Sequence, residues 1–224
     1  MRINYAGVCF QGLVRKNNED NIYINGSFLE KDHKDSPVFS GKVDGGRFAV
    51  FDGMGGECDG EAASYIAASN YGSKDLYQLN RLICDYSTEH RLSFCGTTAA
   101  TAEINGQRIT ISNIGDSRVY RYHHRDQQLE QISCDHVRIY NNRRYLTQSL
   151  GQKSFLIEPH ETSHDLLTGS KYLLCSDGLT DMLSDREIRS FMDKPADVIV
   201  KNLQETVMDK GAVDNTSIIV LEIN

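Results

Sequence analysis

The chain is built from short apolar runs, several of which alternate with polar residues, and most are separated by Gly, Asn or Asp. Runs of about four to eight residues bounded by such turn residues are typical of β-strands. The pairs Asn25-Gly26 and Asn105-Gly106 fall between neighbouring runs and favour hairpin turns. We predict strands at 3–9, 21–28, 47–51, 97–104, 108–114, 117–122, 155–158, 171–175 and 215–223.

Helical periodicity is confined to the middle of the chain and the region near its end. Ser184 and Glu187 have the spacing of a capping box, in which each side chain binds the other residue's backbone N–H. Pro195 suits the first turn of a helix, and Gly211 suits the residue just beyond one. We predict helices at 60–70, 74–90, 184–192 and 195–210.

The order of these elements indicates the fold class. Strands and helices do not alternate along the chain, which argues against a doubly wound parallel sheet. Two packed antiparallel sheets flanked by helices, an α+β architecture, fit the order better. The 224 residues are 39% hydrophobic, which is ordinary for a globular protein and sufficient to bury a core. We expect a single domain over residues 1–224, and we expect a monomer because no assembly motif is evident.

Charge and cysteine content narrow the range of partners. The net charge is −7 and the basic residues are mostly scattered, which argues against binding to nucleic acid or to an anionic membrane. No apolar run approaches the roughly 18 residues that are needed to span a bilayer. The chain has six cysteines but no hydrophobic segment at its start, so we expect reduced thiols and a cytoplasmic location.

The stretch VCFQGLVRKNNEDN places Cys9 and Arg15 at the spacing used by cysteine-dependent phosphatases. A phosphate-binding loop of that kind needs glycines with inward-pointing N–H groups and a positive setting that lowers the pKa of the thiol. The five intervening residues are mostly bulky, and Cys9 continues a strand-like run. We therefore interpret Cys9 as a buried structural cysteine.

A second pattern, HETSH, resembles a zinc-peptidase motif in which His160 and His164 share one face of a helix. Glu187 could then serve as a distant third ligand. The pattern requires a helix, and the intervening residues are indifferent helix formers that are followed by a glycine. We favour histidines on a strand or loop and keep the zinc peptidase as a distant alternative.

A third group consists of acidic residues at the ends of apolar strands, next to Gly or Asn. Such positions place carboxylates at the rim of a sheet, and a neighbouring glycine lets a backbone carbonyl approach a cation closely. Convergence of these oxygens would suit hard divalent ions such as Mg²⁺ or Mn²⁺. The alternative is that Asp-Gly and Asp-Asn are ordinary turn residues. The acidic group comprises Glu19, Asp20, Asp52, Asp116, Asp177, Asp181 and Asp214.

These segments, in this order, resemble the metal-dependent serine/threonine phosphatases of the PPM type, the protein phosphatase 2C family, in its compact bacterial form. The similarity extends from about Tyr5 to Glu222. It implies a central β-sandwich of two antiparallel sheets with α-helices on both sides, in four layers. The matching blocks are RKNNEDN, FDGMGGECDGEAAS, CGTTAAT, NIGDSRVYR, SCDHV, LTQSLG, LLCSDGLTDMLS and DNTSIIV.

The resemblance implies a role for each acidic position. Asp52 would bridge two Mn²⁺ or Mg²⁺ ions, with the Gly53 carbonyl on one and with Asp177 and Asp214 on the other. Arg15 would bind the substrate phosphate through its paired guanidinium donors. The remaining positions are Glu19 and Asp20, which would act through metal-bound waters, and Asp116 and Asp181, which match a third, weaker ion in bacterial relatives.

The implied activity is hydrolysis of phosphoserine and phosphothreonine in proteins, including a serine/threonine kinase or its targets. A hydroxide held by the two ions would attack phosphorus directly, with no covalent phosphoenzyme. Asp52 and Arg15 would be catalytic, and Cys9 would be a bystander. The alternative from another class is a weakly active or inactive regulatory module with the same fold. Intact Arg15, Asp52, Asp177 and Asp214 argue against that alternative.

Three departures from the family pattern affect the expected site. Met54 stands where some relatives have a histidine proposed as general acid, so the general acid is unassigned. Glu57 stands where a histidine is common. Between SCDHV and LTQSLG only a short segment replaces the usual flap, so we expect an open rim. Arg143 and Arg144 in that segment either contact an acidic or phosphorylated peptide or are simply solvated.

Overall fold

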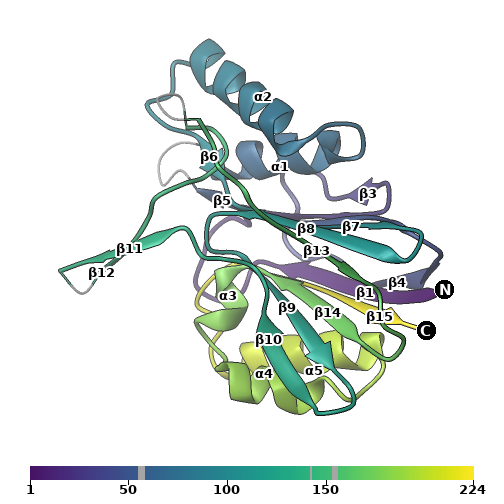
Figure 1. Cartoon of the computed structure of the whole chain (residues 1–224). Helices are drawn as coiled ribbons and strands as arrows, with labels where there is room; N and C mark the ends of the chain where they lie inside the picture. The colour runs from purple at the N-terminus through teal and green to yellow at the C-terminus, as the bar shows by residue number, and fades with distance from the viewer. Residues whose placement is uncertain (55–58, 142, 153–155) are drawn as a thin grey trace.

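The computed structural model describes residues 1–54, 59–141, 143–152 and 156–224, in which it contains fifteen strands and five helices. Two antiparallel sheets stack face to face, and helices cover the outer face of each (Figure 1). The predicted four-layer α+β sandwich is therefore confirmed. In the described ranges, no helix is both long and apolar enough to cross a lipid bilayer.

The first sheet has six strands in the order β10-β9-β14-β15-β1-β4. Its central strand β15 is almost entirely buried because neighbouring residues pack on opposite faces: Ile219 lies in the core between the sheets, and Ile218 lies against the helices. The strands are β1 (Ile3–Phe10), β4 (Phe39–Val43), β9 (Arg118–His123), β10 (Gln128–Gln131), β14 (Lys171–Cys175) and β15 (Thr216–Ile223).

The second sheet runs in the order β13-β8-β7-β5-β2-β3, with β6 paired to β5. In the described ranges, β11 and β12 form a separate two-stranded hairpin that pairs with neither large sheet. The strands are β2 (Asp20–Ile24), β3 (Ser27–Phe28), β5 (Gly46–Met54), β6 (Gly96–Thr97), β7 (Ala99–Asn105), β8 (Arg108–Ile114), β11 (Val137–Tyr140), β12 (Arg143–Leu146) and β13 (His160–Asp165).

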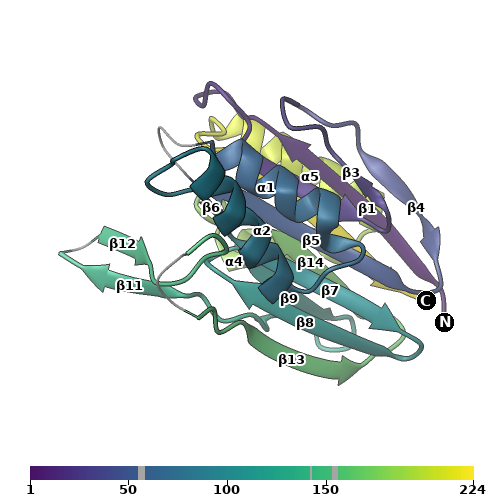
Figure 2. The same cartoon turned by 90° about the horizontal axis from the view of Figure 1, so that it is seen from above.

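The helices form the two outer layers, α1 and α2 over the second sheet and α4 and α5 over the first (Figures 1 and 2). The predicted capping box is present, since Ser184 and Glu187 bind each other's backbone N–H groups at the start of α4. Gly211 follows α5 with a φ of 103°. The helices are α1 (Gly60–Tyr71), α2 (Leu76–Glu89), α3 (Asp177–Thr180), α4 (Asp185–Phe191) and α5 (Ala196–Asp209).

One predicted strand is wrong. Residues 156–158 are not in a strand, residue 155 lies outside the described residues, and the strand of this region is β13, His160–Asp165. Among the described residues, β13 is an edge strand that pairs only with β8, and its exposure alternates between intermediate and exposed. It therefore lacks the apolar signal of a buried strand.

The same strand rules out the zinc-peptidase alternative. His160 and His164 lie on β13, where four residues span about 13 Å, rather than on successive turns of a helix. Of the other strands, β4, β10, β11 and β12 were not predicted; none of their residues is fully buried.

Candidate active site

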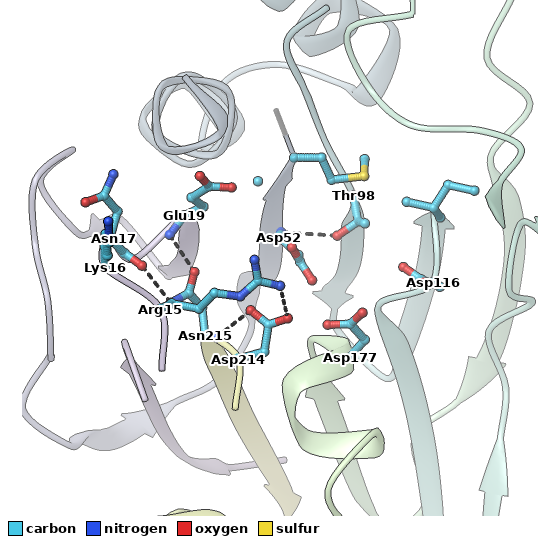
Figure 3. A pocket seen from close by; sticks show the side chains of 13 residues that line it. Arg15, Lys16, Asn17, Glu19, Asp52, Thr98, Asp116, Asp177, Asp214 and Asn215 are labelled. Atoms are coloured by element: carbon cyan, nitrogen blue, oxygen red, sulfur yellow. Dashed lines mark hydrogen bonds and ion pairs between the residues drawn. The ribbon is translucent and has the colours of Figure 1, made fainter. Parts of the chain in front are cut away.

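A cavity of about 490 Å³ opens at one end of the sandwich, where residues from distant parts of the sequence meet (Figure 3). Asp52 on β5, Asp177 at the start of α3 and Asp214 just before β15 face one another there. The predicted convergence of strand-end carboxylates is thus observed for most of the set. The lining residues are Arg15, Lys16, Asn17, Glu19, Asp52, Gly53, Met54, Thr98, Asp116, Leu146, Asp177, Asp214 and Asn215.

The sheets hold Asp52 firmly at the cavity. Its backbone N–H donates to Thr98 Oγ1 at 3.1 Å, and its carbonyl accepts from the Thr98 N–H at 2.8 Å. Gly53 packs so tightly that a Cβ there would collide with the carbonyl oxygens of Glu19 and Gly60. A side chain at position 53 would push these segments apart, which explains the glycine beside the central carboxylate.

Two predicted positions do not line the cavity. Asp20 lies behind its wall, with 1% of its surface exposed, and accepts a hydrogen bond from Ser176 Oγ at 2.7 Å. Asp181 follows α3, and its side chain is 57% exposed. Asp20 still acts on the site electrostatically, because its charge raises the pKa of Asp52.

The carboxylates at the cavity repel one another. Burial is the main cause that raises the pKa of Asp52 well above its usual range, and the charges of neighbouring aspartates raise it further. Burial and the neighbouring aspartates raise the pKa of Asp177 to about 6. Burial, opposed by hydrogen bonds from serines, raises the pKa of Asp20 to about 7. Concentrated negative charge with oxygen donors is the chemistry that suits a hard divalent cation.

The donor geometry limits how an ion could be held. Among the described residues, no three His, Cys, Asp or Glu side chains are arranged to hold one ion by themselves. Asp214 is engaged by Arg15, whose Nη2 lies 2.5 Å from Asp214 Oδ2. Backbone carbonyls or water would therefore have to complete each coordination sphere, and a cation would compete with Arg15 for Asp214.

Asn215 organises the loop that carries Arg15 and Glu19, and the sequence analysis missed it. Its Nδ2 donates to the carbonyls of Gln11 and Asn17, each at 2.9 Å, and its Oδ1 accepts from the Glu19 N–H at 2.9 Å. The side chain is buried. The available signal was the position of Asn215 between Asp214 and an apolar strand, where a buried amide can satisfy loop backbone groups.

Cys9 is a buried residue of β1 and does not line the cavity. Burial raises the pKa of its thiol, and the charge of Asp20 adds to that effect. Its sulfur lies 3.3 Å from both His33 Nε2 and Asn18 Nδ2. A thiol in this setting is poorly ionised, so the structure agrees with a structural role.

The departures from the family pattern have different outcomes. Met54 lines the cavity, whereas Glu57 lies outside the described residues. The short segment that replaces the flap forms the β11–β12 hairpin. On that hairpin Arg143 is exposed, whereas Arg144 makes ion pairs with Asp116, Asp135 and Asp181 and is not simply solvated.

The raised pKa values predict an unusual dependence of stability on pH. Between about pH 4 and 7, metal-free folded protein binds more protons at Asp20 and Asp177 than the unfolded chain, so their contribution to stability falls as pH rises. Mn²⁺ favours the deprotonated carboxylates. The increase in Tm on adding Mn²⁺ should therefore be larger at about pH 7.5 than at about pH 5. Equal increases at both pH values, measured by thermal melts, would contradict this prediction.

Comparison with known proteins identifies relatives of this chain. A family model described as protein phosphatase 2C matches residues 61–212. The serine/threonine protein phosphatase PstP of Mycobacterium tuberculosis is 29% identical over 252 residues, which cover 99% of this chain and 45% of that protein. The serine/threonine phosphatase stp of Listeria welshimeri is 26% identical over 262 residues, covering 96% of this chain and 93% of the relative.

A solved structure supports the same relationship. The catalytic domain of PstP in complex with two manganese ions has a TM-score of 0.75 and 28% identity, and the match covers 100% of both chains. That structure contains only the catalytic domain, and this chain spans less than half of full-length PstP. The family model covers more than half of the 224 residues. The chain belongs to the protein phosphatase 2C family.

Proposed function

We propose that this chain is a Mn²⁺- or Mg²⁺-dependent protein phosphatase that hydrolyses phosphoserine and phosphothreonine. The observation that carries the proposal is that Asp52, Asp177 and Asp214 converge from separate elements on one cavity that Arg15 also lines. The names of the relatives and the two manganese ions of the PstP structure support it.

Different residues of the cavity would bind the two ions. Asp52 would bridge two cations, the Gly53 carbonyl would complete one sphere, and Asp177 and Asp214 would complete the other. Glu19 lines the cavity and would act through water, while buried Asp20 supports the site through its charge. When bound, the two cations would activate water as the nucleophile and stabilise negative charge on the phosphoryl oxygens.

Arg15 binds the substrate phosphate in this proposal. Its side chain is 57% exposed and pairs with Asp214, so it is accessible from solvent and already directed at the cavity. With a cation on Asp214, the guanidinium would be available to donate two hydrogen bonds to a phosphate. Arg15 thereby positions the phosphorus next to the cation-binding carboxylates.

No general acid is assigned. Met54 carries no proton to donate, and it lies in the cavity where some relatives have a histidine. Water in the cavity could then supply the proton to the leaving alkoxide. Phosphate esters with good leaving groups should depend less on this step than phosphopeptides do.

The same proposal covers the domain organisation, oligomeric state, substrates and location of the protein. Residues 1–224 form one phosphatase domain that acts as a monomer on phosphoproteins, including a serine/threonine kinase or its targets. Free thiols at Cys9, Cys134 and Cys175 support a reducing, cytoplasmic setting. The inactive-module alternative is disfavoured because Arg15 and the cation-binding aspartates are all present at the cavity.

A metal-dependence assay tests the function. We expect hydrolysis of p-nitrophenyl phosphate and of a phosphothreonine peptide with Mn²⁺, none with excess chelator, and unchanged activity in Cys9→Ser because the Cys9 thiol lies outside the cavity. The same assay with Zn²⁺ in place of Mn²⁺ tests whether the protein is instead a zinc enzyme. Activity that survives chelator but is lost in Cys9→Ser would reverse the assignment. Metal binding without turnover would instead favour the inactive module.

A further inference from the structure

A second, smaller cavity adjoins the candidate active site. Its volume is about 120 Å³, and Lys16 and Asn17 line both cavities. In the close view of the site, these two residues lie beyond Glu19, on the side opposite Asp116 (Figure 3). A space of this size is too small for a whole ligand but fits one side-chain group of a longer molecule. The small cavity is therefore placed to receive a group from a substrate that already occupies the candidate active site.

Lysines dominate the charge of the small cavity. Lys16, Lys31 and Lys34 line it, and none of them makes an ion pair within the described part of the chain. The carboxylates among its lining residues are Asp32 and Glu61, so the lysines outnumber them by three to two. This balance is opposite in sign to the net charge of −7 of the whole chain. Lysines without an ion-pair partner favour an anionic ligand.

The loop that carries Lys31 and Lys34 is fixed to the body of the protein. The buried Asn18 side chain donates from Nδ2 to the Lys34 carbonyl at 2.6 Å. The backbone N–H of Ser36 donates to the Cys9 carbonyl at 2.8 Å, and the Cys9 N–H donates to Ser36 Oγ at 3.0 Å. Because these bonds hold the loop against β1, the two lysines lie beside the cavity before any ligand binds. Little ordering of the backbone is then needed on binding.

His33 lies between these two lysines in the sequence but adds no positive charge. Its Nδ1 donates to the Glu30 carbonyl at 2.7 Å, and its Nε2 lies 3.3 Å from the sulfur of Cys9. Burial is the main cause that lowers the pKa of His33. The imidazole is therefore neutral near pH 7, and the positive charge of the small cavity comes from its lysines.

We propose that the small cavity binds a second phosphoryl group of a substrate whose first phosphoryl group occupies the candidate active site. This inference rests on the proposed function, because Arg15 has to bind the first group. Gln11 connects the two places, since it lines the small cavity and its Nε2 donates to the Arg15 carbonyl at 2.6 Å. A phosphoryl group carries nearly two negative charges and three acceptor oxygens, so several lysines favour it over a carboxylate.

The contact between the cavities limits the spacing of the two groups. Lys16 lines both spaces, so they lie side by side. An extended peptide advances about 3.3 Å per residue. The second phosphorylated residue should therefore lie within about three residues of the first, and the preferred substrates are peptides phosphorylated at two nearby positions.

Kinetics with matched peptides test the proposal. Each peptide carries one phosphothreonine and has alanine, glutamate or a non-hydrolysable phosphonate analogue of phosphoserine at one position up to three residues away. With wild type and Mn²⁺, the best-placed phosphonate should lower KM by about fivefold to tenfold relative to alanine, and glutamate should lower it less. The advantage should shrink as salt is raised, because exposed charges are screened. Equal preference for glutamate and phosphonate would overturn the assignment to a phosphoryl group.

A double variant tests the lysines directly. Lys31→Gln/Lys34→Gln should bring the KM ratio between the alanine and phosphonate peptides close to one. Lys42→Gln/Lys201→Gln removes the same charge from two exposed positions that line neither cavity, and it should keep the wild-type ratio. A ratio that is near one in wild type, or equal in wild type and Lys31→Gln/Lys34→Gln, overturns the proposal.

Fluorescence anisotropy in excess chelator separates this proposal from the proposed function. Binding there needs no turnover, and the labelled phosphonate peptide should bind wild type and the control about fivefold more tightly than Lys31→Gln/Lys34→Gln. Equal Kd values for all three proteins would defeat the second phosphoryl site even if all three hydrolysed phosphothreonine. A failure to hydrolyse any peptide with Mn²⁺, while this difference in Kd persists, would defeat only the proposed function.

Discussion

Replacing Asp177 with asparagine is expected to lower kcat/KM toward a phosphothreonine peptide by about 10³-fold at fixed Mn²⁺, the upper end of the loss expected when one preorganised group that stabilises the transition state is removed. Asparagine keeps the shape of the side chain but removes the negative charge that a cation requires. Asp177 opens α3 and faces Asp52 across the cavity, so no other carboxylate can take its place without moving a backbone element. Steady-state kinetics with increasing Mn²⁺ provide the measurement.

The same variant separates catalysis from stability. Burial and neighbouring aspartates raise the pKa of Asp177 to about 6, so its charge destabilises the metal-free fold at neutral pH. Asp177→Asn should therefore have a Tm equal to or above that of wild type without Mn²⁺, and a smaller increase when Mn²⁺ is added. Asp197→Asn, on the exposed first turn of α5, is the matched control and should leave both properties unchanged. Full activity in Asp177→Asn would refute its assignment to the cation site.

Asn215→Ala should damage both stability and activity. It leaves the carbonyls of Gln11 and Asn17 and the N–H of Glu19 without their partner, which costs about 2–4 kcal/mol of unfolding free energy. Because these bonds position the loop that carries Arg15, kcat/KM should also fall by about 10²-fold, as expected for a misplaced phosphate-binding group. Urea denaturation and steady-state kinetics measure the two effects.

Leu203→Ala is the control for the stability loss alone. Leu203 is fully buried where α5 packs on the first sheet, and it does not line the cavity. Truncating it to alanine should lower the free energy of unfolding by about 2–5 kcal/mol. At a temperature where both variants are folded, Leu203→Ala should retain its activity. If the two variants lost activity in parallel with stability, Asn215 would have only a structural role.

The sequence predicted the inner strands well because burial on both faces leaves a clear apolar signal. β15 and β14 are examples, with nearly every residue buried. The edge strands β4, β10 and β13 carry polar or half-exposed residues and depend on pairing with a neighbour that lies elsewhere in the sequence. Such strands have no local pattern from which they could be found.

The candidate site, too, could be predicted only in part from the sequence. Each aspartate that we propose as a cation ligand could be singled out because it stands where an apolar strand meets Gly or Asn, and the order of the motifs pointed to the family. Contacts between loops could not be derived in this way. The hydrogen bonds of Asn215 and the ion pairs of Arg144 join residues that are far apart in sequence and depend on how the two sheets stack.

The neighbouring positions of β1 and β15 have a consequence for biosynthesis. Ile3 pairs with Ile223 and Phe10 with Thr216, so β1 cannot pair with β15 until about 200 further residues have been synthesised. Closing so long a loop carries a large entropic cost and favours slow folding. Arg15 follows β1 and Asp214 precedes β15, so nascent chains that end before Asp214 lack both a central strand and one side of the cavity. The cavity can therefore assemble only after β15 has been synthesised.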